Sequence, residues 1–203
     1  MDINPTYFRN IIQLNKPTTV KEYRVYRSKN KKTYFFCDEL SNEILIAKQK
    51  QKNKNIFVII DNECNQLAEI QKSGYKTNKF HRIYKLYFKK KDFSQIIGIH
   101  KNNHSYSNTF YIPSIIEEGN GINSFKILED IQTREKIVFD STKFLQSGNF
   151  INHLKSIKNC QYYLDDSLRF ELVKESSNKF KVYLDNPLSI VQGFMLALIN
   201  IRI

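Results

Sequence analysis

The sequence predicts a mainly β protein: a closed antiparallel barrel of about twelve strands around a buried hydrophobic C-terminal α-helix. Two observations lead to this fold class. Short runs rich in Tyr, Phe, Val and Ile, broken by polar turns, fill most of the 203 residues. The chain then ends in a segment that is apolar on every side of a helix. With 41% hydrophobic residues, a chain of this length has room for one substantial core, so we expect a single domain over residues 15–203.

The elements are expected in the following order. Residues 1–14 form a short N-terminal helix or extension, with a helix over 5–14 behind Asn4 and Pro5. The β-like runs then follow at 20–27, 33–37, 43–48, 55–61, 66–71, 79–88, 95–100, 109–113, 125–131, 136–139, 143–145, 157–164, 168–173 and 179–185. No helix-length segments separate these runs as in βαβ units, so we predict an antiparallel barrel or sandwich rather than a parallel sheet.

Several runs alternate between apolar and polar residues. In LRFELV, Leu168, Phe170 and Leu172 fall on one face, and Arg169 and Glu171 fall on the other. This alternation is typical of a sheet with one dry face and one face in contact with water.

The last predicted element is a helix over residues 187–201. Asn186 suits the N-cap, and Pro187 suits the first helical position, where the missing N–H would have had no partner. At about fifteen residues the helix is roughly 22 Å long, which is short of the ~20 apolar residues that span a bilayer. Burial in protein is therefore expected. A barrel of about twelve strands is wider than an eight-stranded one, and this helix can fill it.

The net charge of +12 is unevenly distributed along the chain. Residues 1–101 contain 21 Lys and Arg against 9 Asp and Glu, whereas the second half is balanced. Such a field favours nucleic acid, phospholipid headgroups or acidic proteins as partners. In KQKQKNKN the lysines fall at every second position, so an extended hairpin would place them on one side as a basic ridge: Lys48, Lys50, Lys52 and Lys54.

The sequence offers little catalytic or metal-binding chemistry. Cys37, Cys64 and Cys160 have no CxxC spacing, and His100 and His104 lie in a loop-like segment. No GxSxG, P-loop, GxGxxG or HExxH motif occurs. We therefore predict a protein that is not an enzyme and needs no metal or cofactor. No segment has the pattern of a secretory signal, so we expect it in the cytosol or the nucleus.

The C-terminal residues resemble a known signature. The segment SIKNCQYYL and the ending KFKVYLDNPLSIVQGFMLALINI are similar to the C-terminal motifs of tubby-like domains. The matching residues are Ser156, Ile157, Lys158, Asn159, Gln161, Phe180, Asp185, Pro187, Leu188, Gln192, Phe194, Ala197 and Leu198. Weaker similarity extends over residues 15–203. The resemblance implies a closed twelve-stranded barrel around the C-terminal helix.

The resemblance also implies a headgroup site. Tubby-like domains are not enzymes, and many bind phosphoinositides, chiefly the 4,5-bisphosphate, through an Asn that opens a strand, a Lys-x-Arg pair and a further Arg. The Asn position falls on Asn55. The Lys-x-Arg positions fall on Glu69 and Gln71 or, with a shift of one residue, on Ile70 and Lys72. A carboxylate at the Lys position would repel a phosphate, so this chain departs from the pattern there.

We therefore predict a non-enzymatic module that binds anionic membranes and phosphoinositide headgroups at the plasma membrane, with an adaptor role toward protein cargo in membrane-protein trafficking. The predicted headgroup residues are Asn55, Lys52, Lys54, Lys72, Lys90 and Lys91. Two alternatives stay open. One is a nucleic-acid-binding or transcription-related protein, for which the basic and aromatic segment 79–91 could contact phosphates and stack bases. The other is a protein-interaction scaffold that has lost lipid binding.

Overall fold

The computed structural model describes the backbone of most of the predicted strands and of the C-terminal helix. The described residues are 21–64, 66–73, 81–88, 94–101, 108–113, 115–117, 125–127, 136–142, 154, 156, 158–164, 166–185, 188 and 190–202. Side chains are described for 22–64, 66–71, 154, 156, 158–163, 166–185, 188 and 190–201. The predicted N-terminal helix over 5–14 and the predicted strand over 143–145 lie outside the described residues.

The described chain is mainly β, and one helix follows the last strand. The strands are β1 (Lys21–Arg27), β2 (Thr33–Cys37), β3 (Glu43–Gln49), β4 (Ile56–Asp61), β5 (Gln66–Ser73), β6 (His81–Phe88), β7 (Ser94–Lys101), β8 (Asn108–Pro113), β9 (Ile115–Glu117), β10 (Phe125–Ile127), β11 (Lys136–Thr142), β12 (Cys160–Leu164), β13 (Ser167–Lys174) and β14 (Lys179–Leu184). The helix is α2 (Ile190–Arg202). The prediction of a mainly β fold with a C-terminal helix is confirmed.

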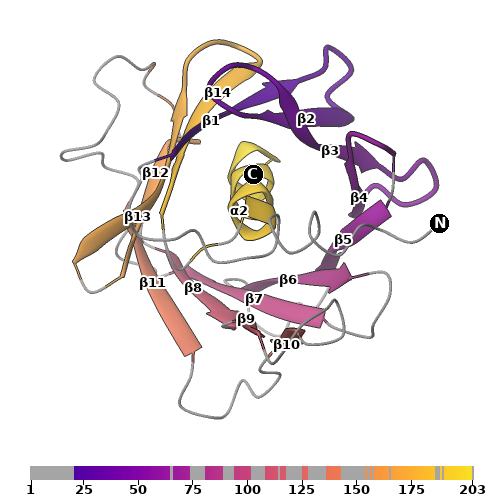
Figure 1. Cartoon of the computed structure of the whole chain (residues 1–203). Helices are drawn as coiled ribbons and strands as arrows, with labels where there is room; N and C mark the ends of the chain where they lie inside the picture. The colour runs from indigo at the N-terminus through magenta and orange to yellow at the C-terminus, as the bar shows by residue number, and fades with distance from the viewer. Residues whose placement is uncertain are drawn as a thin grey trace.

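Antiparallel pairing connects these strands. The strands with described side chains form a continuous sheet in the order β12-β13-β14-β1-β2-β3-β4-β5. The pairing order then continues through β6, β7, β8 and β11, and β11 pairs with β12. β9 and β10 form a separate small sheet. Figure 1 shows α2 in the middle, with the strands arranged around it.

Helix α2 supplies the centre of the core. Its residues 191–200 are all buried, and Phe194 is fully enclosed with its ring 4.9 Å from that of Phe36 in β2. One of its buried polar side chains, that of Asn200, donates to the Tyr162 hydroxyl at 2.7 Å and to the Leu196 carbonyl at 2.8 Å. A helix that is apolar on all sides is stable only in such surroundings.

The helix begins later than its sequence indicates. The predicted range was 187–201, whereas α2 is Ile190–Arg202. Leu188 is buried but not helical, and its N–H donates to the Asp185 carbonyl at 3.1 Å. A turn therefore connects β14 to the helix before the first helical residue.

The prediction that one face of β13 is in contact with water is wrong. Glu171 is fully buried, like Phe170 and Leu172, although the alternation placed Glu171 in water. Gln161 on β12 donates from Nε2 to Glu171 Oε1 at 3.1 Å, which supplies a partner for the buried carboxylate. Val173 and Tyr183 form a second small apolar cluster, separate from the cluster around α2. Both faces of this part of the sheet are therefore covered.

Candidate functional site

The antiparallel order gathers alternate turns at one end of the strands. The β1–β2 turn lies beside the end of β3, because Gln49 N–H donates to the Lys32 carbonyl at 2.9 Å. It also lies beside the β13–β14 turn, because Arg27 N–H donates to the Asn178 carbonyl at 2.8 Å. Leu154 joins them by donating to the Lys174 carbonyl at 2.8 Å. Segments that are far apart in the sequence thus share one end of the sheet.

This end, which we call the basic end, is dominated by cations. Its turns and the adjoining strand residues carry Arg27, Lys29, Lys31, Lys32, Lys48, Lys50, Lys52, Lys54, Lys158, Lys174 and Lys179. Among the described residues of this end, the carboxylates are those of Glu69 and Glu175. Glu175 pairs with Lys179 at 3.0 Å. The basic end therefore carries a large positive excess.

The opposite end, which we call the acidic end, has the reverse balance among the residues that the structure describes. Its turns and strand ends carry Glu22, Asp38, Glu39, Glu43, Asp61, Glu63, Asp166 and Asp185. Its cations include Arg24, whose guanidinium donates to Ser41 Oγ at 3.0 Å, and Arg169, which pairs with Asp185 at 2.9 Å. Among the described residues, charge is thus divided between the two ends of the sheet. The sequence shows a division of charge between the two halves of the chain, but this describes the structure less well. Three lysines of the basic end come from the second half: Lys158, Lys174 and Lys179.

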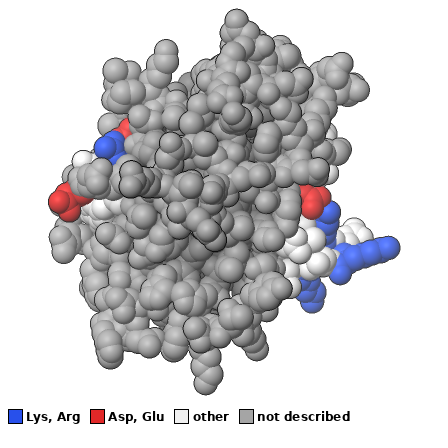
Figure 2. Space-filling view, turned by 90° about the horizontal axis from the view of Figure 1, so that it is seen from below, with Lys and Arg blue, Asp and Glu red and all other residues white. Residues whose placement is uncertain are grey.

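The predicted site residues Lys52, Lys54 and Asn55 are exposed and lie together at the basic end. They belong to the β3–β4 turn, residues 50–55. The prediction that these lysines form a ridge on an extended hairpin is therefore wrong for residues 50–55. Gln49 Nε2 donates to the Lys54 carbonyl at 2.7 Å, and Asn55 N–H donates to Asn53 Oδ1 at 3.0 Å. These bonds fold the segment into a turn instead of continuing the strand. Figure 2 shows blue side chains projecting from the flank where β3, β4 and β5 lie in Figure 1.

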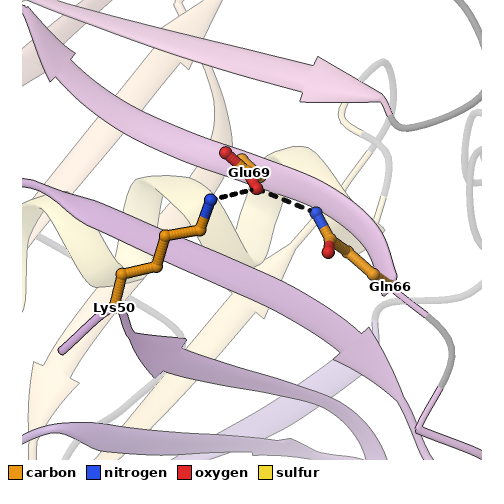
Figure 3. A network of polar contacts seen from close by, with 3 residues as sticks. All are labelled: Lys50, Gln66 and Glu69. Atoms are coloured by element: carbon orange, nitrogen blue, oxygen red, sulfur yellow. Dashed lines mark hydrogen bonds and ion pairs between the residues drawn. The ribbon is translucent and has the colours of Figure 1, made fainter. Parts of the chain in front are cut away.

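Glu69 lowers the positive charge next to this turn. Its carboxylate accepts from Lys50 Nζ at 2.6 Å and from Gln66 Nε2 at 3.0 Å, as Figure 3 shows. Lys50 and Glu69 retain 41% and 26% of their side-chain exposure, so the ion pair is a surface one that adds little stability. The ion pair instead neutralises the charge of Lys50. It also places a carboxylate at the position where the resemblance to tubby-like domains implies a cation.

The structure leaves the remaining predicted site residues partly described. Gln71 and Lys72 lie on β5, where their backbones pair with Lys85 and Tyr84 of β6. The side chain of Lys72 lies outside the described residues, and so do Lys90 and Lys91.

Four cations that the sequence did not single out as site residues meet elsewhere at the basic end. We call them the Arg27 cluster: Arg27, Lys31, Lys158 and Lys174. Strand alternation puts Arg27 on the face of β1 that holds the buried Val25, and its guanidinium lies 6.0 Å from the ring centre of Phe180. It donates to Asn178 Oδ1 at 3.1 Å and to the Ser177 carbonyl at 2.7 Å. These bonds fix the cation at the β13–β14 turn.

Lys158 is held against the same turn by its neighbour. Asn159 is buried, its Oδ1 accepts from Lys174 N–H at 2.8 Å, and its Nδ2 donates to the Leu154 carbonyl at 2.9 Å. Burial lowers the pKa of Lys158, and the charges of Arg27, Lys174 and Lys31 lower it further. Arg27, Lys174 and Lys31 therefore lie near enough to Lys158 to disfavour its charged form.

Lys31 occupies an unusual backbone conformation in the β1–β2 turn. Its φ is 59°, in the left-handed region that a β-carbon disfavours. Side chains hold the turn: Asn30 Oδ1 accepts from Ser28 Oγ at 2.6 Å and from Lys32 N–H at 3.0 Å, and Ser28 Oγ accepts from Thr33 N–H at 3.0 Å. The turn thus places a lysine where glycine or asparagine would be less strained.

Comparison with known proteins adds no identification. No protein-family model matches the chain, and no curated protein is similar to it. No helix in the described part of the chain is long and apolar enough to cross a membrane. Within that part, no group of three His, Cys, Asp or Glu side chains is placed to hold a metal ion.

Proposed function

We propose that the chain is a compact, diverged tubby-like domain, a closed twelve-stranded barrel around its C-terminal helix. Two observations support this assignment. The pairing order that begins at β12 leads through β5, β6, β7, β8 and β11 back to β12. The residues that carry the resemblance, among them Phe194, Ala197 and Leu198, lie in the buried centre.

We further propose that the protein is a non-enzymatic module that attaches to anionic membranes and binds phosphoinositide headgroups through its basic end. The observation that carries this proposal is the division of charge between the two ends. A protein whose lysines served only for solubility would not need them gathered on one end and acids on the other. A field of this shape orients the molecule toward an anionic surface during approach.

The number of cations is adequate for reversible attachment. Each juxtamembrane Lys or Arg contributes about 1 kcal/mol against an anionic leaflet, and the contribution falls off within a Debye length, about 8 Å at physiological salt. The β3–β4 turn supplies Lys52, Lys54 and the side-chain amide of Asn55. The other turns of the basic end add further cations. Such a module would work in the cytoplasm at the plasma membrane, as an adaptor that presents protein cargo.

Nucleic-acid binding has less support. Base stacking needs exposed aromatic side chains beside the cations. Among the described residues the exposed large hydrophobic side chains are Leu40 and Leu154, and neither is aromatic. Tyr26, at the basic end, is partly buried and lies 5.7 Å from Lys179 Nζ. The segment 79–91 that suggested this alternative has no described side chains.

Vesicle co-sedimentation at physiological salt tests the proposal. The wild-type chain should pellet with vesicles that contain phosphatidylinositol 4,5-bisphosphate and much less with vesicles of equal charge made with phosphatidylserine. Lys52→Gln, Lys54→Gln and Asn55→Ala together should lower pelleting about tenfold or more, because two juxtamembrane charges are removed. The matched control, Glu39→Gln with Glu63→Gln at the acidic end, should leave pelleting unchanged or raise it. No pelleting of the wild-type chain with either vesicle would refute the function.

A further inference from the structure

We propose that the Arg27 cluster is a second headgroup subsite, which binds the phosphate monoesters of an inositol lipid while Leu154 enters the membrane surface beside it. This inference rests on the proposed membrane-binding function. It assigns a site to residues that lie apart from Asn55, Lys52 and Lys54, on different turns of the basic end.

The backbone brings the four cations together from three neighbouring segments. Arg27 ends β1 and is bonded to the β13–β14 turn, and Lys174 ends β13 at the same turn. Lys158 precedes the Asn159 side chain that accepts from the Lys174 backbone. Lys31 lies in the turn that begins after Arg27, where Ser28 N–H donates to the Thr33 carbonyl at 2.9 Å. Hydrogen bonds therefore hold the segments that carry the four cations next to one another.

The charge of the cluster fits two phosphate monoesters. Each phosphate monoester carries about −1.5 to −2 charges at neutral pH, so a bisphosphate headgroup carries about −3 to −4. Four cations match this charge, and the Arg27 guanidinium offers N–H groups in the fixed geometry that suits phosphate oxygens. The described carboxylate of the adjoining turn, Glu175, is paired with Lys179. The β3–β4 turn differs in this respect, because Glu69 pairs with Lys50 there.

Leu154 points to a lipid surface instead of a soluble phosphate compound. It is 49% exposed, although its backbone is fixed on both sides by bonds to Lys174 and Asn159. An exposed leucine next to a cationic cluster gains free energy only if apolar surface covers it. The chain offers a matched control at the other end, because Leu40 is 77% exposed in the acidic β2–β3 turn.

A pair of substitutions removes charge from the cluster with little risk to the fold. Lys31→Asn suits the left-handed backbone better than lysine, and Lys158→Gln relieves like-charge repulsion on a partly buried amine. The probes are soluble inositol 1,4,5-trisphosphate, measured by calorimetry, and vesicles with phosphatidylinositol 4,5-bisphosphate. The double variant should lose about 25-fold in affinity for the vesicles, since one such lysine accounts for about fivefold, and it should also bind the soluble trisphosphate more weakly. Unchanged affinity for both probes would overturn the subsite.

The outcomes separate this inference from the function on which it rests. If the double variant binds as wild type while the Lys52, Lys54 and Asn55 variant loses pelleting, the function stands and the subsite is wrong. If wild-type protein binds neither probe, both are wrong. If wild type binds the soluble trisphosphate and does not pellet with vesicles, the lipid source is wrong, and the subsite as proposed is overturned.

A second arm tests the leucine. Leu154→Asn should lower vesicle pelleting about fivefold and leave binding of the soluble trisphosphate unchanged, because only the lipid surface covers that side chain. Leu40→Asn, at the acidic end, should change neither. Equal losses from the two leucine variants would contradict the proposed orientation on the membrane.

Discussion

The two ends of the sheet are built from the same strands and differ in charge. At the basic end the turns carry lysines from both halves of the chain, whereas the turns and strand ends of the acidic end hold most of the described carboxylates. Along the strands, every second side chain belongs to the apolar core around α2. Turn residues lie on the surface and need not be apolar. The fold therefore determines which turns come together, and the turn sequences determine which end is positively charged.

Charge reversal at one end at a time is expected to give the largest effect. Lys158→Glu with Lys174→Glu changes the basic end by four charge units, which at about 1 kcal/mol each predicts a loss of about a thousandfold in vesicle affinity. The matched reversal, Glu39→Lys with Glu63→Lys, should not weaken binding. A co-sedimentation titration measures both. Equal effects would mean that total charge, not the basic end, controls attachment.

A change in the core should affect both ends alike. In Gly193→Ala the added β-carbon would lie 2.6 Å from Leu184 Cδ1 and 2.7 Å from Cδ2, and Leu184 is fully buried. Overpacking of this kind costs about 1–3 kcal/mol, which outweighs the ~1 kcal/mol that alanine gains over glycine in a helix. Urea unfolding should show a loss of about 1 kcal/mol, with the preference among headgroups unchanged. A more stable variant would contradict the close packing of α2 on β14.

Both ends have non-glycine residues with a left-handed backbone, and Lys31 at the basic end should respond differently from Ser41 at the acidic end. Lys31→Gly should raise the free energy of unfolding by about 1 kcal/mol, because it removes the disfavoured conformation of a residue with a β-carbon. Ser41→Gly, at φ 70°, should gain less, because the Ser41 hydroxyl accepts from Arg24 at 3.0 Å. Urea unfolding of the two variants checks the order.

The acidic end should lose stability at alkaline pH. Burial first, then the charges of Glu43 and Asp38, raise the pKa of Cys37 from 9.0 to about 11. Burial and Asp38 raise the pKa of Tyr23 from 10.0 to about 12. At a pH between the ordinary and the raised pKa of each group, the unfolded chain releases a proton that the folded chain keeps. The free energy of unfolding therefore falls as pH rises above about 9. Cys37→Ala should make this fall shallower in unfolding measured from pH 8 to 11.

Lys158 at the basic end should act in the opposite direction. Burial holds its pKa in the folded chain below the ordinary value of 10.5, so the unfolded chain binds the proton more strongly. The contribution of Lys158 to the free energy of unfolding therefore increases as pH rises toward the ordinary lysine pKa. Lys158→Gln removes this gain, and its alkaline loss of stability should be steeper than that of wild type. A shallower loss would contradict the lowered pKa.

The sequence predicts the strands better than the arrangement of charge. β2 is found over the predicted residues 33–37, because its aromatic and apolar run is bounded by polar turns. The Arg27 cluster could not be found in this way. Lys31 and Lys158 are far apart in the sequence, and only the antiparallel register places their segments at one end. That register depends on which strands are neighbours, which periodicity along one strand does not contain.

Buried polar residues and turns account for the remaining errors. Glu171 was placed in water because alternation assumes one covered face, and here both faces of β13 are covered. Lys48, Lys50, Lys52 and Lys54 were placed on one side of an extended hairpin because lysines at every second position suit a strand. Side-chain bonds from Gln49 and Asn53 fold that segment into a turn instead. Such local bonds compete with strand pairing and leave little signal in hydrophobic periodicity.

Collisional quenching on the membrane tests most directly whether the basic end faces the lipid. In a Cys64→Ser background, where Cys37 and Cys160 are buried, a fluorophore would be attached through Lys29→Cys at the basic end or Glu39→Cys at the acidic end. The vesicles would contain phosphatidylinositol 4,5-bisphosphate and brominated phosphatidylcholine. We expect strong quenching of the label at residue 29 and almost none at residue 39. Equal quenching at both positions, or stronger quenching at residue 39, would contradict membrane attachment through the basic end.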